Sequence, residues 1–323
     1  MNTLIKSLLA AAMLTLAIGA VAQPAYPDRP VRVTVSFTPG TAADLTARLI
    51  GQYLGEAWGK PVTVENMPGA AGNIGAAHVA RAAPDGYTLL MSGDAAMTTN
   101  VTLYEKLPFD PVKDFSPISI AVLSTNLLVV NPAVPARDVQ ELVKLARAEP
   151  GKLSYASAGS GTSQHLGAEM LKQMAGIDMV HIPYKGLPPA LTDLVGGRVQ
   201  LMFANIVSAL PLVRDGKLRA LAVSSSKRWP QMADLPTVAE SGFSGFDAVA
   251  WFGLLAPAGT PDAVIKKVHQ DTVKALAQPE LRARLVNAGL EVIGNSPQEF
   301  AAQIREEIVR KGKLVKFSGA KPD

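Results

Sequence analysis

Two turns in the sequence combine small residues with hydroxyl groups, a composition that suits the binding of a small anion. The first turn contains Thr38, Gly40, Thr41 and Asp44. The second contains Ser157, Gly159, Ser160, Gly161, Thr162 and Ser163. Each turn lies between a strand pattern and a helix pattern, so it would point backbone N–H groups and the positive end of a helix into a cleft. If the two turns face each other, their neutral N–H groups would hold one carboxylate without an arginine.

Both turns also have a purely structural interpretation. Thr41 and Asp44 fit T-x-x-D, a capping box in which Thr41 Oγ accepts a hydrogen bond from the Asp44 N–H. The Asp44 carboxylate would accept from the Thr41 N–H in return, and Gly40 would only help to turn the chain. The second turn would be a flexible loop, with Thr162 or Ser163 capping the next helix. The residues of the turns leave both interpretations open.

Residues outside the turns are weaker candidates for ligand binding. Ser92 and Asp94 follow a third strand pattern and would lie at the same edge of the sheet. Asp94 would either accept a hydrogen bond from a ligand amine or cap the next segment. Trp251 lies in an apolar run, where it would either line the cleft or pack in the core. Lys185, beside a proline-rich turn, is typical of a solvated loop lysine.

Common catalytic and cofactor motifs do not occur in the sequence. There is no G-x-S-x-G, and Gln164 occupies the position of the third glycine in a dinucleotide motif. The four histidines lack zinc-binding spacing, and the chain has no cysteine. We therefore expect no catalytic residue, no cofactor and no metal, which argues against an exported hydrolase.

The elements that must position the two turns alternate between strands and helices along the chain. The strand patterns cover residues 31–37, 61–66, 87–93, 126–132, 153–157, 178–184, 199–205, 218–224 and 248–257. The helix patterns cover residues 44–59, 73–86, 139–152, 163–175, 188–196, 261–277, 279–288 and 297–315. This alternation predicts an α/β fold with mostly parallel sheets and helices on both faces.

The length of the chain favours two domains, because about 300 residues exceed what one hydrophobic core organises. The runs 126–132 and 248–257 are apolar without alternation, so we predict that they are two strands passing between the lobes. The second lobe would then be an insertion over 126–245. The first lobe would consist of 23–125 and 246–323.

The N-terminus has the order of a secretory signal peptide over residues 1–22. A lysine precedes an apolar run that ends in Ala-Val-Ala, and this run is shorter than a membrane-spanning helix. We expect cleavage after Ala22 and export to the periplasm. The chain has a net charge of +4, and its lysines and arginines are scattered along the sequence. The sequence therefore does not predict nucleic-acid binding.

A long series of motifs resembles the substrate-binding proteins of tripartite tricarboxylate transporters, the Bug family. The series includes YPDRPVRVTVSFTPG, VENMPGAAGNIGAAHVARAAPDGYTLL, KLSYASAGSGTSQHLGAEM and GKLRALAVSS, and it covers nearly all of the chain after the leader. The resemblance implies a type II periplasmic binding-protein fold that closes two lobes on a small carboxylate held by the two turns. It also implies delivery of the ligand to a membrane permease. A receptor of the same fold that signals to a sensor protein is the alternative, and we expect a monomer.

The sequence departs from the family at the first turn, which usually reads P-F-P-P-G-G. Here Ser36 and Thr38 replace prolines, and Thr41 replaces the second glycine. We expect the ligand specificity to differ from that of relatives at Thr38 and Thr41. Near the C-terminus, Lys311-Gly312 replaces a lysine–tryptophan pair, and we expect this change to have little bearing on the ligand. Gly161→Asp should abolish binding while leaving the fold intact, because it places a negative charge against the ligand anion.

Overall fold

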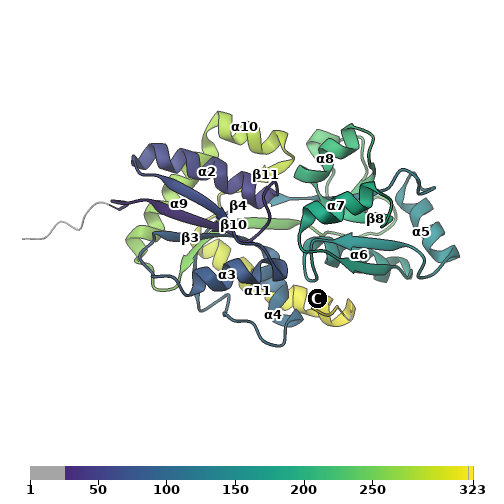
Figure 1. Cartoon of the computed structure of the whole chain (residues 1–323), viewed down its shortest axis with the longest axis horizontal. Helices are drawn as coiled ribbons and strands as arrows, with labels where there is room; N and C mark the ends of the chain where they lie inside the picture. Colours follow the sequence, from purple (N-terminus) through teal and green to yellow (C-terminus); the bar gives the residue numbers. More distant parts are fainter. Residues whose placement is uncertain (1–25, 319, 323) are drawn as a thin grey trace, which may run out of the picture.

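The structure, a computed structural model, describes residues 26–318 and 320–322. Its two β-sheets lie side by side along the long axis of the molecule (Figure 1). We call the six-stranded sheet, with the helices that pack on it, lobe 1, and the five-stranded sheet, with its helices, lobe 2. The predicted signal peptide, residues 1–22, lies outside the described residues.

Lobe 1 is a sheet between two layers of helices, with the strand order β11-β4-β10-β3-β1-β2. The strands are β1 (Val31–Val35), β2 (Val62–Asn66), β3 (Thr88–Gly93), β4 (Phe115–Ser124), β10 (Ala250–Pro257) and β11 (Leu290–Val292). One face packs against α2 (Ala42–Trp58), α9 (Asp262–Ala277) and α10 (Pro279–Asn287). The other packs against α3 (Asn73–Ala80) and the long C-terminal α11 (Pro297–Ser318). Short helical segments are η1 (Ala70–Gly72), η2 (Ala95–Thr99) and α4 (Asn100–Leu103).

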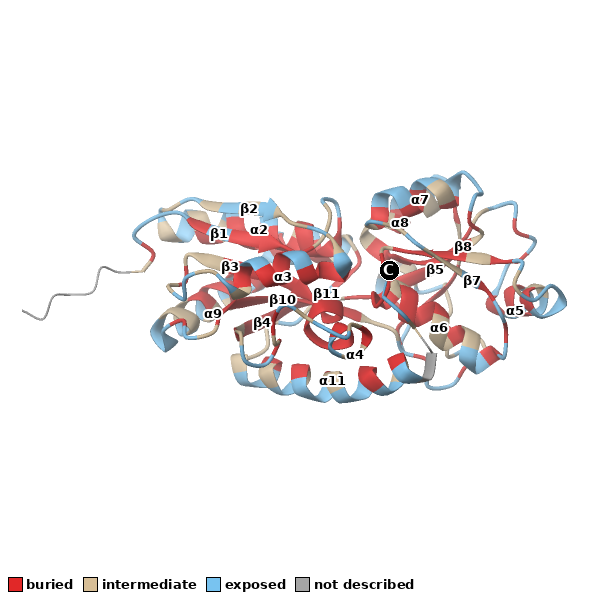
Figure 2. Ribbon diagram, turned by 60° about the horizontal axis from the view of Figure 1, so that its bottom comes forward, coloured by how far each residue is buried: buried red, intermediate tan, exposed pale blue. Residues whose placement is uncertain are grey.

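Lobe 2 has the same layering, with the strand order β7-β6-β8-β5-β9. The strands are β5 (Asn126–Val130), β6 (Ser154–Ser157), β7 (Val180–Pro183), β8 (Leu201–Asn205) and β9 (Arg219–Val223). Helices α5 (Val139–Ala148) and α6 (Ser163–Ala175) cover one face, and α7 (Leu187–Val195) and α8 (Ile206–Arg214) cover the other. A short segment, η3 (Pro230–Met232), follows β9. Figure 2 shows the strands of both sheets mostly buried between the helices.

The predicted α/β architecture is confirmed, and most strands of each sheet run in one direction. Strands β10 and β5 run against both of their neighbours, because the chain enters each lobe from the other one, and the edge strand β11 runs against β4. β4 ends at Ser124, and Asn126 already belongs to β5 in lobe 2. The chain returns where the Ala248 N–H donates to Ser224 O, just before β10. Each apolar run therefore lies within one sheet, and the crossings come at the start of each run.

The helical stripe that the sequence predicts in α2 is buried in lobe 1. Leu49, Ile50 and Leu54 are at most 5 % exposed and pack in the core. The helix ends at Gly59, whose left-handed φ of 61° suits glycine.

Two long elements were absent from the sequence prediction, and each contains a proline. Pro117 lies in β4, where it pairs with Leu255 next to a register shift that accommodates the missing N–H. Pro211 lies inside α8, which packs on lobe 2 despite the lost helical hydrogen bond. Among the described residues, no helix is long and apolar enough to span a membrane.

Candidate functional site

A cavity of about 610 Å³ lies between the lobes, where the carboxyl ends of β1, β3, β6 and β8 meet. Both turns that the sequence singles out contribute to its wall. Six of the predicted site residues line it: Thr38, Thr41, Asp94, Gly159, Thr162 and Ser163. The other seven do not, and they lie behind or beside the wall: Gly40, Asp44, Ser92, Ser157, Ser160, Gly161 and Trp251.

The first turn is held by Asp44, although not as the predicted capping box. Thr41 is the N-cap of α2, but its side chain accepts no capping hydrogen bond and Oγ1 instead donates to Thr38 O at 2.9 Å. The Asp44 carboxylate accepts from the Gly40 N–H at 3.0 Å, one residue earlier than predicted. The capping-box prediction is therefore wrong, because the hydroxyl turns back to close the tight turn.

This arrangement leaves backbone donors at the start of α2. Among the described residues, the N–H groups of Thr41 and Ala42 have no hydrogen-bond acceptor. Burial of the Asp44 carboxyl works to raise its pKa, but hydrogen bonds from Arg48, the Gly40 N–H and Asn66 outweigh it and lower the pKa. Asp44 therefore stays ionised and fixes the turn from behind.

The second turn is capped as predicted. The Thr162 side chain accepts from the His165 N–H at the start of α6, and its hydroxyl donates to Gly159 O at 2.7 Å. Among the described residues, the N–H groups of Ser163 and Gln164 have no acceptor, and both residues line the cavity. Each lobe thus presents the N-terminal end of a helix to the same space.

Two stacked histidine rings support the second turn from behind. The rings of His165 and His181 lie 4.0 Å apart and within 5° of parallel, and Tyr155 extends the stack. The Gly161 N–H donates to His165 Nδ1 at 3.0 Å, so this nitrogen carries no proton. Ser157 Oγ accepts from the Gly159 N–H at 3.2 Å and hydrogen-bonds His181 Nε2 at 2.7 Å. Ser157 therefore orders the turn and does not reach the cavity. The buried Ser160 does not line the cavity either.

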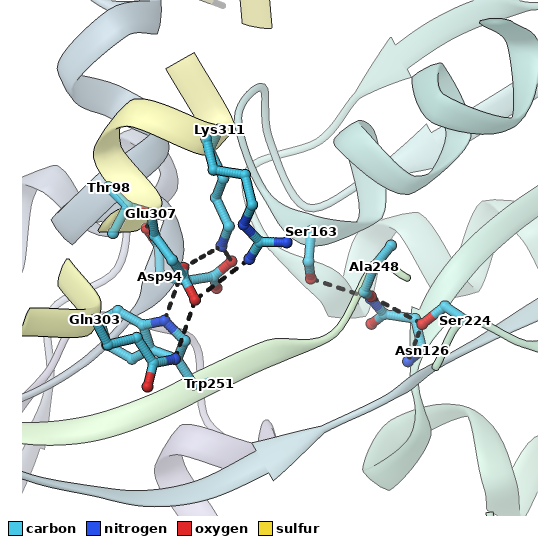
Figure 3. Close-up of polar contacts among 11 residues, drawn as sticks. Asp94, Thr98, Asn126, Ser163, Ser224, Ala248, Trp251, Gln303, Glu307 and Lys311 are labelled. Atoms are coloured by element: carbon cyan, nitrogen blue, oxygen red, sulfur yellow. Dashed lines mark hydrogen bonds and ion pairs between the residues drawn. The ribbon is translucent and has the colours of Figure 1, made fainter. Parts of the chain in front are cut away.

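A polar network connects the second turn to the crossing strands. Asn126 Nδ2 donates to Ser163 Oγ at 3.1 Å, and the Asn126 N–H donates to Ser224 Oγ at 2.9 Å (Figure 3). Ser224 Oγ in turn donates to Ala248 O at 2.9 Å. The cavity-lining Ser163 is thereby tied to both points at which the chain crosses between the lobes.

Asp94 belongs to a buried charged cluster that the sequence did not indicate. Its carboxylate pairs with Lys311 Nζ from α11, and Lys311 also lies 2.9 Å from Glu307 Oε2 (Figure 3). Asp94 makes no capping hydrogen bond to η2, so that prediction is wrong. Burial disfavours the charged form of Lys311, but the two carboxylates outweigh it and raise its pKa. Lys311, the residue of the lysine–tryptophan pair that the chain keeps, thereby holds a residue of the cavity wall.

Trp251 belongs to the same cluster and does not line the cavity. Its side chain is 1 % exposed, its ring packs edge-on against Phe300, and Nε1 donates to Glu307 Oε2 at 3.0 Å. The adjacent residue, Phe252, points to the other side of β10 and lines the cavity. Because successive side chains of a strand point to opposite faces of the sheet, Trp251 lies in the buried cluster and Phe252 faces the cavity.

Ser92 and Ser36 form a buried pair behind the wall. Their hydroxyl oxygens are 3.0 Å apart. Gly75 packs so closely on Ser36 that a Cβ atom would lie 3.0 Å from the Ser36 Cα and 2.9 Å from Met67 O. Ser36 is also a lining residue, but it is 1 % exposed and its hydroxyl is engaged with Ser92.

Direct contacts join the two lobes around the cavity. Ser208 Oγ in α8 donates to Gly40 O at 3.0 Å. A Cβ atom on Gly161 would lie 2.5 Å from Leu103 Cδ2 and 2.6 Å from Asn100 Oδ1, both in α4 of lobe 1. Gly161 thus faces the opposite lobe and not the ligand space. The expected loss of binding in Gly161→Asp would come from this clash, and not from charge repulsion with the ligand.

The sequence reasoning missed several residues of the cavity wall. The loop before α3 contributes Gly69, Ala70, Ala71 and Gly72. Ala70 and Ala71 have positive φ angles of 47° and 50°, which alanine rarely adopts. The residue types at these positions therefore did not predict this backbone conformation. Lys185, which the sequence suggested was a solvated loop lysine, lines the cavity. Asn205 lines it from the end of β8. The feature of the sequence that could have pointed to this loop is the G-x-x-G-x-x-G spacing of residues 69–75.

Comparison with known proteins places the chain among solute receptors. A family model described as "Tripartite tricarboxylate transporter family receptor" matches residues 46–319. The structure titled "R. palustris Rpa4515 with adipate" is 36 % identical, with a TM-score of 0.89 over 92 % of this chain and 100 % of that one. The periplasmic binding protein BugD is 35 % identical, with a TM-score of 0.87 over 92 % and 100 %. MatC from Rhodopseudomonas palustris with bound malate is 35 % identical, with a TM-score of 0.84 over 90 % and 100 %.

Proposed function

The chain belongs to the tripartite tricarboxylate transporter receptor family, and we propose that it binds a small organic carboxylate in the cavity between its lobes. The receptor holds the ligand with backbone N–H groups and hydroxyls and then delivers it to a membrane permease. The binding step involves no catalysis. We further propose that residues 23–125 with 246–323, and residues 126–245, move as the two lobes that open and close the cavity.

The observation that carries this proposal is the pair of helix starts that face one cavity. Thr41 at the start of α2 and Ser163 and Gln164 at the start of α6 line it with N–H groups that have no acceptor among the described residues. Helix N-termini favour negative charge, and each N–H group can donate one hydrogen bond to an anion. A carboxylate offers two oxygens in one plane, which suits donors that approach from two sides.

The charges of the wall favour an anion of modest size. Among the described lining residues, Lys185 is the only lysine or arginine, and Asp94 is the only carboxylate. Asp94 is already paired with Lys311. The donors are therefore mainly neutral, and a cavity of about 610 Å³ has room for a small organic molecule. The adipate and malate in the two related structures are carboxylates of this kind.

The family membership and the N-terminal sequence support a location in the periplasm. We propose that residues 1–22 are removed during export and that the mature receptor acts as a monomer. A partner in the membrane would receive the ligand when the lobes separate. The genes next to this one would show whether the partner is a permease or a sensor.

The proposal is tested by measuring carboxylate binding directly. The mature chain is unfolded and refolded to remove any carried-over ligand, and mono-, di- and tricarboxylates are then titrated by calorimetry. Uncharged sugars of similar size serve as controls. We expect at least one carboxylate to bind and to raise the melting temperature, and no sugar to do so. Binding of sugars without carboxylates would contradict the proposal.

A matched pair of variants isolates the backbone donor of the second turn. Ser163→Pro removes the N–H at the first position of α6, where a helix tolerates proline. Ser163→Ala removes only the hydroxyl and keeps the N–H. Because a hydrogen bond to a charged group is worth about 1.5–3 kcal/mol, we expect Ser163→Pro to bind the carboxylate at least about tenfold more weakly than Ser163→Ala. Equal affinities would remove this N–H from the site.

A further inference from the structure

Away from the two helix starts, the surface of the cavity is largely apolar. Large side chains made mainly of carbon line it at six positions, which we call the apolar wall: Phe37, Ile74, Tyr104, Tyr184, Leu187 and Phe252. Ile74 is 52 % exposed, and of the exposed large hydrophobic residues among those described it is the only one that lines the cavity. Its Cδ1 lies over Gly69, where a Cβ atom would be 2.5 Å away. Apart from its polar end, a ligand in the cavity would therefore meet mainly carbon.

Two phenylalanine rings form part of the apolar wall in lobe 1. Phe37 follows β1 and Phe252 lies in β10, and their ring centroids are 5.5 Å apart in an edge-on arrangement. Gly93, at the end of β3, lies against both rings, because a Cβ atom there would be 3.1 Å from each of them. Phe37 is only partly buried in the core of lobe 1, and it lines the cavity. A ligand can therefore reach this ring, which its neighbours hold in place.

Tyr184 contributes a further aromatic ring to the apolar wall, from lobe 2. It is partly buried, and its hydroxyl donates to Asp193 Oδ2 at 2.8 Å. Asp193 does not line the cavity, so the part of Tyr184 that is left for a ligand is the ring. The loop that contains Tyr184 comes close to lobe 1, because a Cβ atom on Gly186 would lie 2.7 Å from Thr38 Cγ2. Aromatic rings from both lobes thus border the same space.

The polar side chains of the cavity are mostly bound to other protein groups. The hydroxyls of Thr41 and Thr162 each donate to a carbonyl oxygen within their own turn, at 2.9 and 2.7 Å. Ser36 is 1 % exposed, and the carboxylate of Asp94 is paired with Lys311. A hydroxyl or ammonium group on the body of a ligand would lose its hydration here and find few partners, which is costly. An apolar body instead gains free energy when the apolar wall covers it.

We propose that the ligand is a carboxylate with an apolar body, either a ring or an alkyl chain, and that this body packs against Phe37, Ile74 and Tyr184. The inference rests on the proposed function, because it assumes that the helix starts hold the carboxylate end. A cavity of about 610 Å³ is within the range that holds drug-sized molecules, so it has room for such a body. The apolar wall thereby determines specificity, since it favours apolar carboxylates over hydroxylated ones.

Matched pairs of ligands test the proposal in the wild-type protein. Cyclohexanecarboxylate is compared with quinate, its hydroxylated analogue, and hexanoate is compared with gluconate, by calorimetry on the ligand-free mature chain. Both members of a pair have a single carboxylate and the same carbon skeleton, so charge and length stay constant. The first pair presents a ring and the second a chain. We expect the apolar member of at least one pair to bind at least about tenfold more tightly, because the hydroxyls of its analogue lose hydration without gaining partners.

A matched pair of variants at Tyr184 locates the effect in the apolar wall. Tyr184→Ser removes the ring, so we expect it to bind the apolar carboxylate at least about tenfold more weakly than the wild-type protein. Tyr184→Phe is the control, because it keeps the ring and loses only the hydroxyl that bonds Asp193. The control should keep its affinity within about twofold, since that hydroxyl is turned to a residue outside the cavity.

A second pair of variants uses exposed positions, where a substitution does not disturb the core. Ile74→Asn places a polar group on the apolar wall, and we expect it to weaken binding of the apolar carboxylate by about threefold or more. Val309→Asn is its control, because Val309 is 61 % exposed on α11 and does not line the cavity. The control should leave the affinity unchanged. If Tyr184→Ser does not fold, this pair and the ligand pairs still decide the matter.

The outcomes separate this inference from the proposed function. If quinate and gluconate bind as tightly as their apolar partners, or more tightly, carboxylate binding stands and the apolar body is overturned. If both Tyr184→Ser and Ile74→Asn keep the full affinity for the apolar carboxylate, the body packs elsewhere and the inference also fails. If no carboxylate of any kind binds, the proposed function fails and the inference fails with it.

Discussion

The turns that begin α2 in lobe 1 and α6 in lobe 2 have similar compositions but different supports. In lobe 1 an ionised carboxylate, Asp44, accepts the Gly40 N–H and is itself held by Arg48 and Asn66. In lobe 2 an imidazole nitrogen of His165 without a proton accepts the Gly161 N–H.

The difference follows from the surroundings of each turn. Asp44 has Arg48 as a partner, and half of that side chain reaches solvent, so a charge there is compensated and partly hydrated. His165 is 3 % exposed and stacks on His181. A charged group in that buried stack would lie in a medium of low polarity, where a charge is costly. A similar backbone turn can therefore be fixed by a charged group near solvent or by a neutral group in the interior.

This contrast between charged and neutral groups in the two lobes predicts that the largest loss of stability follows from removing a buried charge in lobe 1. Lys311→Met leaves the carboxylates of Asp94 and Glu307 buried without their cation, so we expect a loss of about 3–5 kcal/mol in the free energy of unfolding. Chemical denaturation measures it. The control is Lys152→Met in lobe 2, whose solvent-exposed pair with Glu149 should contribute about 1 kcal/mol or less. Similar losses in the two variants would contradict this difference.

A comparison of the glycines in the two turns should show a smaller effect, on ligand affinity. Gly161 and Gly40 have φ angles of 84° and 79°, so alanine costs about 1–2 kcal/mol of stability at either position. An added Cβ on Gly161 would meet the opposite lobe, whereas a Cβ on Gly40 meets nothing within 4 Å, and the Gly40 contact with Ser208 involves only its carbonyl oxygen. Because overpacking adds about 1–3 kcal/mol, we expect Gly161→Ala to weaken carboxylate binding by about 100-fold and to favour the open form.

Calorimetry measures the affinities of these two glycine variants, and small-angle scattering measures the closure of the lobes. Gly40→Ala should lose stability but keep its affinity within about fivefold, because its added methyl group enters open space. Equal losses of affinity in the two variants would show that backbone strain, and not contact between the lobes, limits binding.

The imidazole support of lobe 2 should be replaceable by another neutral acceptor. His165→Leu removes the acceptor of the buried Gly161 N–H, so we expect about tenfold weaker ligand binding. In His165→Asn, the side-chain oxygen lies near the position of Nδ1 and should restore most of the affinity. The two variants are compared by calorimetry at neutral pH. If the leucine variant binds normally, the turn does not depend on this hydrogen bond.

The carboxylate support of lobe 1 should give the smallest effect and a distinctive dependence on pH. The pKa of Asp44 is lowered, so its stabilising contribution is complete above the ordinary aspartate pKa of about 4 and is lost as the pH falls through the lowered value. Asp44→Asn should cost about 1 kcal/mol at neutral pH. The difference in melting temperature between the variant and the wild-type protein should be constant from about pH 5 to 8 and should shrink below about pH 4. A constant difference down to pH 2 would contradict the role of the charge.

The sequence predicted both turns and missed how each is held. The cap at Thr162 followed from its local pattern, because the hydroxyl and the N–H it accepts from belong to one helix start. The supports of Gly161 and Asp94 come from residues whose approach depends on folding. His165 is four residues from Gly161, but its orientation comes from stacking on His181 in β7, and Lys311 reaches Asp94 from the last helix.

The strand prediction failed where a local signal opposed the tertiary context. Pro117 argues against a strand, yet β4 forms because it pairs with β10 and β11 on either side. β10 runs against β3 because the chain enters lobe 1 from lobe 2 at this strand, and the even apolar pattern of the strand did not indicate this. Local residue preferences carry no information about strand direction, because direction depends on where the chain enters the sheet.

The sequence by itself determined the α/β class, most of the helices and strands, and the two hydroxyl-rich turns at helix starts. These features depend on contacts within a few residues, through hydrophobic periodicity and capping. Only the tertiary structure decided that Trp251 is buried while Phe252 lines the cavity, that Lys311 neutralises Asp94, and that side chains of both lobes form one apolar wall. Each of these outcomes depends on which distant groups reach the same space, and folding alone brings those groups together.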